Sequence, residues 1–223
     1  MADMSSRFIL RNEIIGIDFS IPSETITEIE FYNVQFISYP TFPQHITSLI
    51  FEQCQFQCED PIQFHEGLHS LRQFQQAMLV GTGYYSVQMP NHVNGDGEAV
   101  HSLHRFLNRT GLGLQPPFRM HLPASLHSLF IRKMRFPTFP TLPESLQVLR
   151  LLRVASPVLQ SFPSSLLKLC IIECYWRILP PFPSQLQVLL LDEIELDTLP
   201  PIPPSVIHYQ ECEVCVRDRH ASS

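Results

Sequence analysis

The chain has 223 residues, of which 20 are proline and only eight are glycine, about twice the usual proline content of a soluble protein. Apolar residues make up 44% and charged residues 16%, which excludes an intrinsically disordered chain and predicts a packed core. The net charge of -6 argues against nucleic acid as a partner, because neutralising phosphates requires clustered lysine and arginine. Neither a long apolar run nor a basic region followed by an apolar core occurs, so we expect no membrane span and no signal peptide.

Prolines recur with a fixed period in two parts of the chain, residues 21–58 and 122–216. Members of the set stand 20 residues apart or a multiple of 20 apart: Pro43, Pro123, Pro143, Pro163, Pro183 and Pro203. A fixed period of this size is typical of a solenoid, in which each repeat forms one turn of a coil. We expect residues 1–20, which precede the first repeat, to form an N-terminal cap.

Each repeat follows the pattern P-x-x-L-x-x-L-x-L, with another apolar position three residues beyond the last leucine. We call these four apolar positions columns one to four; in one repeat they hold Leu186, Leu189, Leu191 and Ile194. Seven copies are readable, and column three of the last copy holds Glu211. A charged residue at a core position predicts that this last repeat is a solvent-facing C-terminal cap, followed by a tail over 217–223.

The spacing within the repeat predicts one strand in each turn. Columns two and three lie two residues apart, the spacing of side chains on one face of a strand. Proline is excluded from helix interiors, so we expect an extended return path with polyproline II segments such as 199–203 on the convex side. The chain is therefore predicted to be an α/β repeat solenoid with a parallel sheet on its concave side and a helical insertion, described below.

The repeat over 179–196, LPPFPSQLQVLLLDEIEL, resembles the short bacterial leucine-rich repeat, L-P-x-L-P-x-x-L-x-x-L-x-V-x-x-N-x-L. Similar repeats occur in effectors of the IpaH/YopM class, which pathogens inject into host cells. The resemblance covers 21–58 and 122–216 and implies a leucine-rich-repeat horseshoe that binds a host protein. It carries over no catalytic residue, because the ubiquitin-ligase domain of IpaH-type effectors has no counterpart in this sequence.

The chain departs from this family at column four, where the family has asparagine. The residues at this position are instead Val34, Cys54, Met134, Val154, Cys174, Ile194 and Val214. The family's asparagines satisfy backbone groups at the bend between repeats. Cysteine is a tolerated substitute there, whereas the aliphatic residues leave open how the backbone groups of the bend are satisfied.

The period fails over residues 59–121, which we interpret as an insertion or as degenerate repeats. The segments 68–71, 100–103 and 126–129 resemble one another, although the first two are out of register with the 20-residue period. We favour two short helices, because apolar residues fall mostly on one face over 68–79 and over 100–107. The loop between them has only Asp96 and Glu98 as carboxylates over 91–98, too few for a calcium loop.

Six cysteines form three close pairs, but the repeat phase argues against most of their possible chemistry. Cys54 and Cys174 fall in column four, where cysteine behaves as a small hydrophobe. Cys212 and Cys215 stay open as free thiols, a disulfide or a metal half-site. No H-E-x-x-H, no G-x-S-x-G and no phosphate-binding glycine loop occurs, so we expect no enzyme activity, no cofactor and no metal.

Residues between the columns are expected to point outward from the sheet, and solenoids bind partners along that surface. The candidate partner-binding residues form an apolar stripe flanked by basic side chains: Phe130, Arg132, Val148, Arg150, Leu152, Arg153, Lys168, Ile172, Val188 and Leu190. An apolar centre with arginines is typical of protein interfaces. We therefore expect a monomeric module that binds a host protein, secreted into the host cytoplasm or otherwise cytoplasmic.

The alternative functions place the working site in the insertion, over residues 72–118. An enzyme would use His92, Asp96, Glu98 or His101 around the glycine-rich loop. A ubiquitin-ligase adaptor would need a docking helix, which only residues 98–109 could supply.

Overall fold

The computed structural model describes residues 6–16, 24–38, 41–56, 62–74, 120–136, 138–156, 159–212 and 215–216. Within these ranges the strands are β1 (Arg7–Arg11), β2 (Ile14–Ile15), β3 (Glu28–Tyr32), β4 (Gln35–Phe36), β5 (Ser48–Glu52), β6 (Gln55–Phe56), β7 (Ile62–Gln63), β8 (Ser70–Phe74), β9 (Met120–His121), β10 (Ser128–Arg135), β11 (Val148–Ala155), β12 (Lys168–Ile172), β13 (Val188–Asp192), β14 (Glu195–Leu196), β15 (His208–Cys212) and β16 (Cys215–Val216). Nine of them form one sheet in the order β1-β3-β5-β8-β10-β11-β12-β13-β15.

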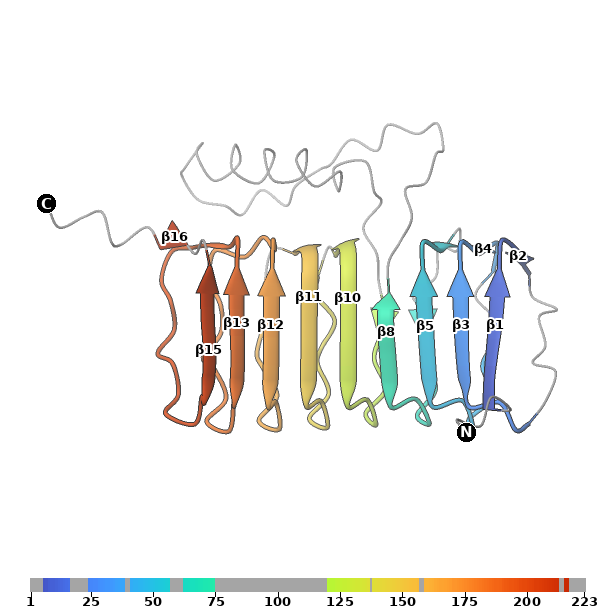
Figure 1. Cartoon of the computed structure of the whole chain (residues 1–223), viewed down its shortest axis with the longest axis horizontal. Coiled ribbons are helices and arrows are strands. Elements are labelled where there is room, and N and C mark those ends of the chain that lie inside the picture. Colours follow the sequence, from blue (N-terminus) through green and yellow to red (C-terminus); the bar gives the residue numbers. More distant parts are fainter. Residues whose placement is uncertain are drawn as a thin grey trace, which may run out of the picture.

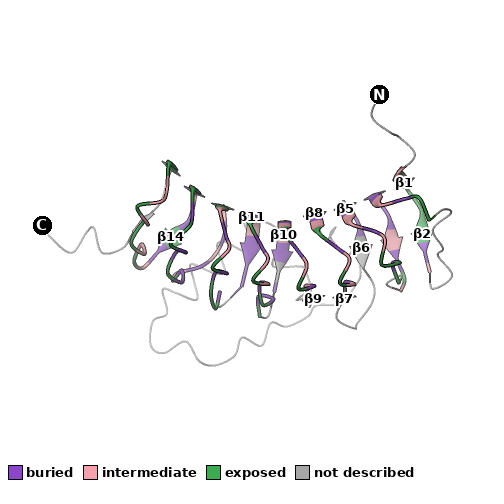
Figure 2. Cartoon of the chain, turned by 90° about the horizontal axis from the view of Figure 1, so that it is seen from below, coloured by how far each residue is buried: buried purple, intermediate pink, exposed green. Residues whose placement is uncertain are grey.

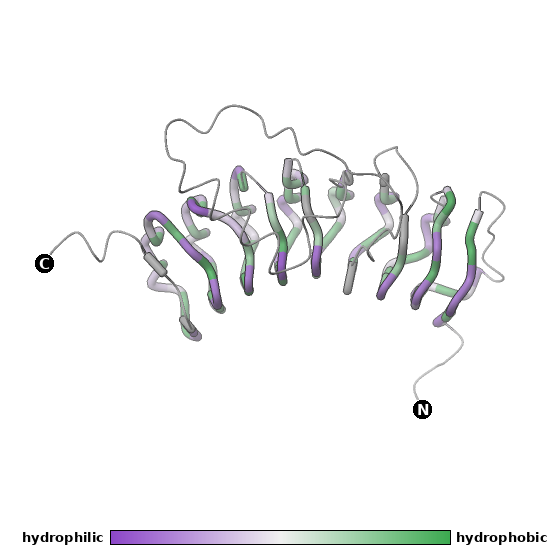
Figure 3. The backbone as a smooth tube through the Cα atoms, turned by 90° about the horizontal axis from the view of Figure 1, so that it is seen from above, coloured by the Kyte–Doolittle hydropathy of each residue, from purple (hydrophilic) through white to green (hydrophobic). Residues whose placement is uncertain are grey.

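The nine strands stack as successive turns of a coil, and every pairing in this sheet is parallel. Leu149 pairs with Leu169, which pairs in turn with Leu189, so neighbouring strands carry equivalent positions of the repeat. Figure 1 shows the strands side by side, and in Figure 3 the turns follow an arc. The predicted parallel-sheet solenoid is confirmed.

The α/β class and the helical insertion fit the structure less well. The described residues contain no α-helix, so within them the protein is an all-β solenoid. The return path over 176–187 has no strand except for an isolated bridge at Ile178, because prolines remove the donors that a ladder requires. The helix predicted over 68–79 is wrong at its start, where β8 lies, and residues 75–119, with the second predicted helix, are outside the described residues.

The segment Leu68-His69-Ser70-Leu71 belongs to a turn of the coil, which fits the degenerate-repeat interpretation of this region and not the helical one. Ser70 pairs with Ser48 on one side and with Ser128 on the other. Leu68 and Leu71 are completely buried, since they occupy columns one and two. Residues 62–74 therefore belong to a genuine repeat.

Two irregularities hid this repeat from the sequence pattern. His65 replaces the phased proline: the Leu68 amide donates to the His65 carbonyl at 3.1 Å, as the Leu146 amide donates to the Pro143 carbonyl at 3.0 Å. Leu71 follows its partner Leu49 by 22 positions instead of 20. The two extra residues precede His65, because the spacing from His65 to Leu68 and Leu71 equals that from Pro43 to Ile46 and Leu49. The turn after His65 packs closely on the previous one, since a Cβ at Gly67 would lie 2.0 Å from the Gln44 carbonyl oxygen.

A further strand lies inside the predicted N-terminal cap. Strand β1 pairs with β3 along its whole length, with Phe8 beside Ile29 and Leu10 beside Phe31. Phe8 and Leu10 are only partly buried against the core, because β1 is the edge strand of the sheet. Residues 7–11 thus form the terminal strand of the sheet.

The core fills the inside of the coil with the four columns (Figure 2). Leu186, Leu189 and Leu191 are completely buried, as the pattern predicts. The amino-terminal turns are filled with aromatic rings, and Phe31 stacks on Phe51 with ring centroids 5.1 Å apart. In the last turn Tyr209, at column two, is 37% exposed, so the equivalent of Leu189 is no longer buried there.

The phased prolines begin the turn that leads into each long strand. In each of the six repeats with a phased proline, the column-one amide donates to the proline carbonyl, over 3.0 to 3.2 Å. Proline fits because only its carbonyl takes part in this hydrogen bond, so its missing N–H costs nothing.

A bend near the end of the long strands, within β10 and β11 and directly after β1, β3, β5, β12 and β13, uses the left-handed backbone conformation. Residues with φ between 47° and 56° are Asn12, Asn33, Gln53, Lys133, Arg153, Glu173 and Glu193, each two residues after column three. The amides of Asn33 and Glu173 donate to strand carbonyls of the next turn, those of Glu52 and Asp192, over 2.8 and 2.9 Å. Backbone groups of neighbouring turns therefore satisfy one another where the family uses asparagine.

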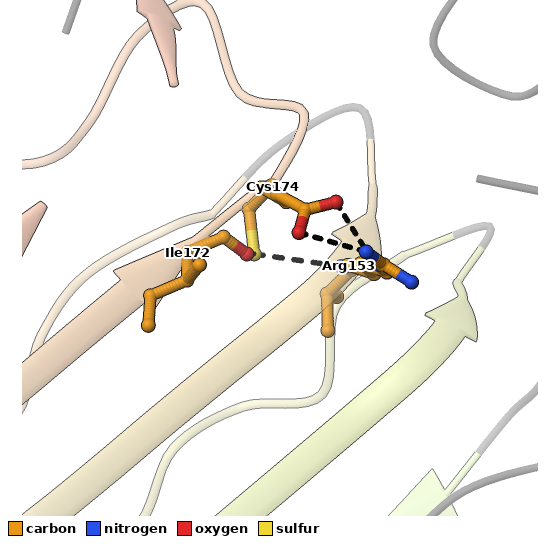
Figure 4. A network of polar contacts seen from close by, with 5 residues as sticks. Arg153, Ile172 and Cys174 are labelled. Atoms are coloured by element: carbon orange, nitrogen blue, oxygen red, sulfur yellow. Dashed lines mark hydrogen bonds and ion pairs between the residues drawn. The ribbon is translucent and has the colours of Figure 1, made fainter. Parts of the chain in front are cut away.

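Cysteine at column four adds its own hydrogen bonds. The Cys174 thiol donates to the Ile172 carbonyl at 3.2 Å and accepts from the Val154 amide at 3.4 Å (Figure 4). The Cys54 thiol lies 3.4 Å from the Phe31 carbonyl oxygen. At both positions the thiol therefore interacts with backbone groups of the bend.

Candidate functional site

The outward-facing residues of β8, β10, β11, β12 and β13 form a surface that we call the concave patch. They alternate with the buried columns and pair across the strands in three rows. The first row is Ser70, Ser128, Val148, Lys168 and Val188; the second is Phe130, Arg150, Cys170 and Leu190; the third is Arg132, Leu152, Ile172 and Asp192. Arg72 is exposed on β8, next to the point where the register with β10 shifts. The views in Figures 2 and 3 place this sheet on the inner side of the arc.

All the sequence-predicted site residues except Arg153 lie in this patch. Arg153 has a φ of 55° at a bend within β11, so it leaves the alternation of the strand. Its guanidinium donates to both Glu173 carboxylate oxygens, over 2.7 and 2.9 Å, and this hydrogen bonding raises the pKa of Arg153. Arg153 therefore joins two turns of the coil and is not part of the concave patch.

The apolar members of the patch remain accessible to a partner. Phe130, Val148, Leu152, Ile172, Val188 and Leu190 are partly exposed. Arg150 and Lys168 are exposed among them. Partly exposed apolar groups on a rigid sheet are a surface that can be buried without a large loss of conformational entropy.

The charges on the concave face are segregated. Strands β8, β10, β11 and β12 contribute Arg72, Arg132, Arg150 and Lys168, which we call the basic centre, and contribute no acidic residue at a described outward position. Acidic residues border it, with Glu52 on β5 and Asp192 on β13. Arg72 was missed from the sequence because its segment was interpreted as helical.

Two arginines of the basic centre are only partly satisfied by hydrogen bonds within the described residues. The Arg72 Nε donates to the Ser70 hydroxyl at 3.1 Å, which holds the guanidinium over the sheet. The Arg132 Nε is buried and has no hydrogen-bond partner there. A buried donor without a partner costs free energy.

The amino-terminal end of the face has a different character. The Glu30 side chain is buried and forms an ion pair with Arg7, and it accepts a hydrogen bond from the Tyr32 hydroxyl at 2.8 Å. This hydrogen bond raises the pKa of Tyr32. The three residues satisfy one another, so we assign them to stabilising the first turns.

Burial suppresses the reactivity of the described cysteines. It raises the pKa of the Cys54 and Cys174 thiols to about 12, and it also raises the pKa of Cys170, which lies in the concave patch. The thiolate is the nucleophile and the metal ligand. None of these three residues is therefore suited to nucleophilic chemistry.

Iodoacetamide should accordingly alkylate Cys54 and Cys174 about a thousandfold more slowly in the native protein at pH 8 than in the unfolded protein, because so little thiolate forms. Peptide mass spectrometry after timed labelling measures each cysteine separately. Partly exposed Cys170 is the internal control and should react at an intermediate rate. Equal rates for native and unfolded Cys174 would contradict the buried assignment.

Other candidate chemistry receives no assignment from the structure. Among the residues described, no three His, Cys, Asp or Glu side chains come close enough together to hold a metal ion. The insertion candidates His92, Asp96, Glu98 and His101, and the side chains of Cys212 and Cys215, are outside the described part.

No helix in the described ranges is long and apolar enough to cross a membrane. Comparison of the sequence with protein-family models and with curated proteins found no match.

Proposed function

We propose that the protein is a non-enzymatic protein–protein interaction module that holds a partner on the concave patch. The observation that carries this proposal is the row arrangement itself, with partly exposed apolar side chains between exposed basic ones on one rigid curved sheet. Interfaces combine a central apolar region with arginines in this way.

The size of the patch suits a protein segment. Five neighbouring strands about 4.8 Å apart extend over about 20 Å. About six residues of extended chain, at about 3.3 Å each, span that length. A partner could therefore present either a short extended segment or the edge of a folded domain.

We further propose that the repeats are of the short leucine-rich type and that the protein acts as an effector inside a host cell, or otherwise in the cytoplasm of its own cell. The support is the resemblance of 179–196 and its counterparts to the repeats of the IpaH/YopM class. The inward leucines and the outward variable residues agree with that type of repeat.

The double substitution Arg150→Glu with Leu190→Asp should abolish capture of the partner from eukaryotic lysate, because it places two carboxylates on the patch. Capture followed by mass spectrometry identifies the partner and measures its recovery. The matched control is Gln160→Glu with Ile178→Asp, which places two carboxylates at exposed positions away from the concave strands. If both variants are folded and both recover the same partner as the unmodified protein, the patch is not the binding surface.

A further inference from the structure

We infer that the segment bound at the basic centre is acidic, with carboxylates on either side of an apolar side chain. This inference rests on the proposed function and names the chemistry of the partner. It follows from the arrangement around Phe130 and from the local charge.

Phe130 is surrounded by three arginines. Arg150 pairs directly with it on β11, and Arg132 lies two residues further along β10 on the same face. On the other side, Leu71 pairs with Leu129 and Phe74 pairs with Ile131, with a register shift between the two pairs. Arg72 is therefore one of the two β8 residues that lie opposite Phe130. An apolar side chain placed on the Phe130 ring would therefore have guanidinium groups within reach in three directions.

The charge of this region opposes that of the whole molecule. The four residues of the basic centre are positive, whereas the chain has a net charge of -6. Adjacent acidic residues on both sides, Glu52 and Asp192, repel an anionic segment that shifts along the sheet. Such a pattern favours a short segment of negative charge and also fixes the position of that segment along the sheet.

Arginine is suited to this role because its planar guanidinium binds a carboxylate through two parallel hydrogen bonds. The exposed Arg150 side chain and the partly exposed Arg132 lie in neighbouring rows of the patch. Two guanidinium groups therefore stand close to the position of Phe130.

The same features favour a peptide over a nucleic acid. A phosphate backbone carries a charge at every nucleotide and would extend from the basic centre onto Glu52 or Asp192. Single strands also rely on several aromatic side chains for stacking, and among the described outward positions of the concave patch Phe130 is the only aromatic residue. The apolar neighbours Leu152 and Ile172 suit aliphatic side chains of a protein.

Fluorescence anisotropy with labelled decapeptides tests the inference on the full chain. The probes carry Glu-Leu-Glu-Leu-Glu, Lys-Leu-Lys-Leu-Lys or Glu-Ser-Glu-Ser-Glu between glycine–serine flanks, and a ten-nucleotide oligothymidine is the nucleic-acid probe. We expect saturable binding of the Glu-Leu peptide alone, weakened by raising the salt from about 0.1 M to about 1 M, where screening shortens to about 3 Å.

Substitutions locate the binding. Arg150→Glu should weaken binding of the Glu-Leu peptide about tenfold or more, since a charged hydrogen bond is replaced by repulsion. The double variant Arg72→Glu with Arg150→Glu should gain binding of the Lys-Leu peptide. The matched control, Arg11→Glu on the concave side of β1, should keep the affinity within about twofold, and circular dichroism confirms that each variant is folded.

Three results would overturn the inference: no saturable binding of the Glu-Leu peptide up to about 1 mM, equal binding of the Lys-Leu peptide, or tighter binding of the oligothymidine. The lysate experiment separates this failure from that of the proposed function. If the peptide result is negative while Arg150→Glu with Leu190→Asp still abolishes capture, the patch binds a protein of other chemistry. If capture persists in that variant, the proposed function itself fails.

Discussion

Replacing Phe51 with alanine is expected to lower the free energy of unfolding by about 3–5 kcal/mol. The Phe51 side chain is completely buried and stacks on Phe31, with ring centroids 5.1 Å apart. It also meets the rings of Phe36 and Phe42 at 5.7 and 6.4 Å. Since the cluster fills several consecutive turns, the backbone around it cannot collapse into the space that alanine leaves.

Urea denaturation followed by circular dichroism measures this loss. Ile37→Ala is the control, because the Ile37 side chain is 56% exposed and its truncation should cost less than about 0.5 kcal/mol. A loss below about 1 kcal/mol for Phe51→Ala would mean that the aromatic cluster does not support the amino-terminal turns.

Replacing Leu71 with alanine should cost about 2–5 kcal/mol, and it should also reduce the cooperativity of unfolding. Leu71 is completely buried in β8, the strand that joins β5 to β10. In a solenoid each turn contacts only its neighbours, so a weakened turn uncouples the turns on either side. We expect a broader or two-step urea transition.

Leu190→Ala is the matched control for this substitution. Leu190 is a leucine in the same sheet, but it faces outward and is partly exposed. Its truncation should cost about 1 kcal/mol or less and leave a single transition. If the two substitutions cost the same, Leu71 does not occupy a core column, and residues 62–74 would be an insertion after all.

The sequence predicts the sheet well where its repeats are regular. Leu149, Leu169 and Leu189 lie 20 positions apart, and the structure pairs them as neighbours. Period-two alternation then decides which residues face outward, so Phe130 and Leu190 could be assigned to the concave side without coordinates. These inferences are reliable because they depend on local spacing alone.

The sequence-based predictions fail where the structure depends on a contact that leaves no pattern in the sequence. His65 supplies the carbonyl that proline supplies elsewhere, and backbone carbonyls are common to all residues, so no pattern of side chains reveals the substitution. Arg72 was missed as a site residue because the repeat that contains it was not recognised. Arg153 was placed on the strand face because its left-handed φ of 55° is a property of the bend, and an arginine carries no signal for it.

The inter-turn polar pairs have a consequence for how the turns find their order during folding. Columns one to four are nearly interchangeable between turns, so a coil that skipped one turn would still bury similar apolar side chains. Misassembly of this kind is characteristic of repeat proteins. If β1 paired with β5 in place of β3, the buried Glu30 would lose its ion pair with Arg7, leaving an uncompensated buried charge. Ion pairs such as that between Arg177 and Asp197, at 2.8 Å, form only when the correct turns are neighbours. They therefore distinguish the native pairing of turns from a wrong pairing that buries apolar side chains equally well.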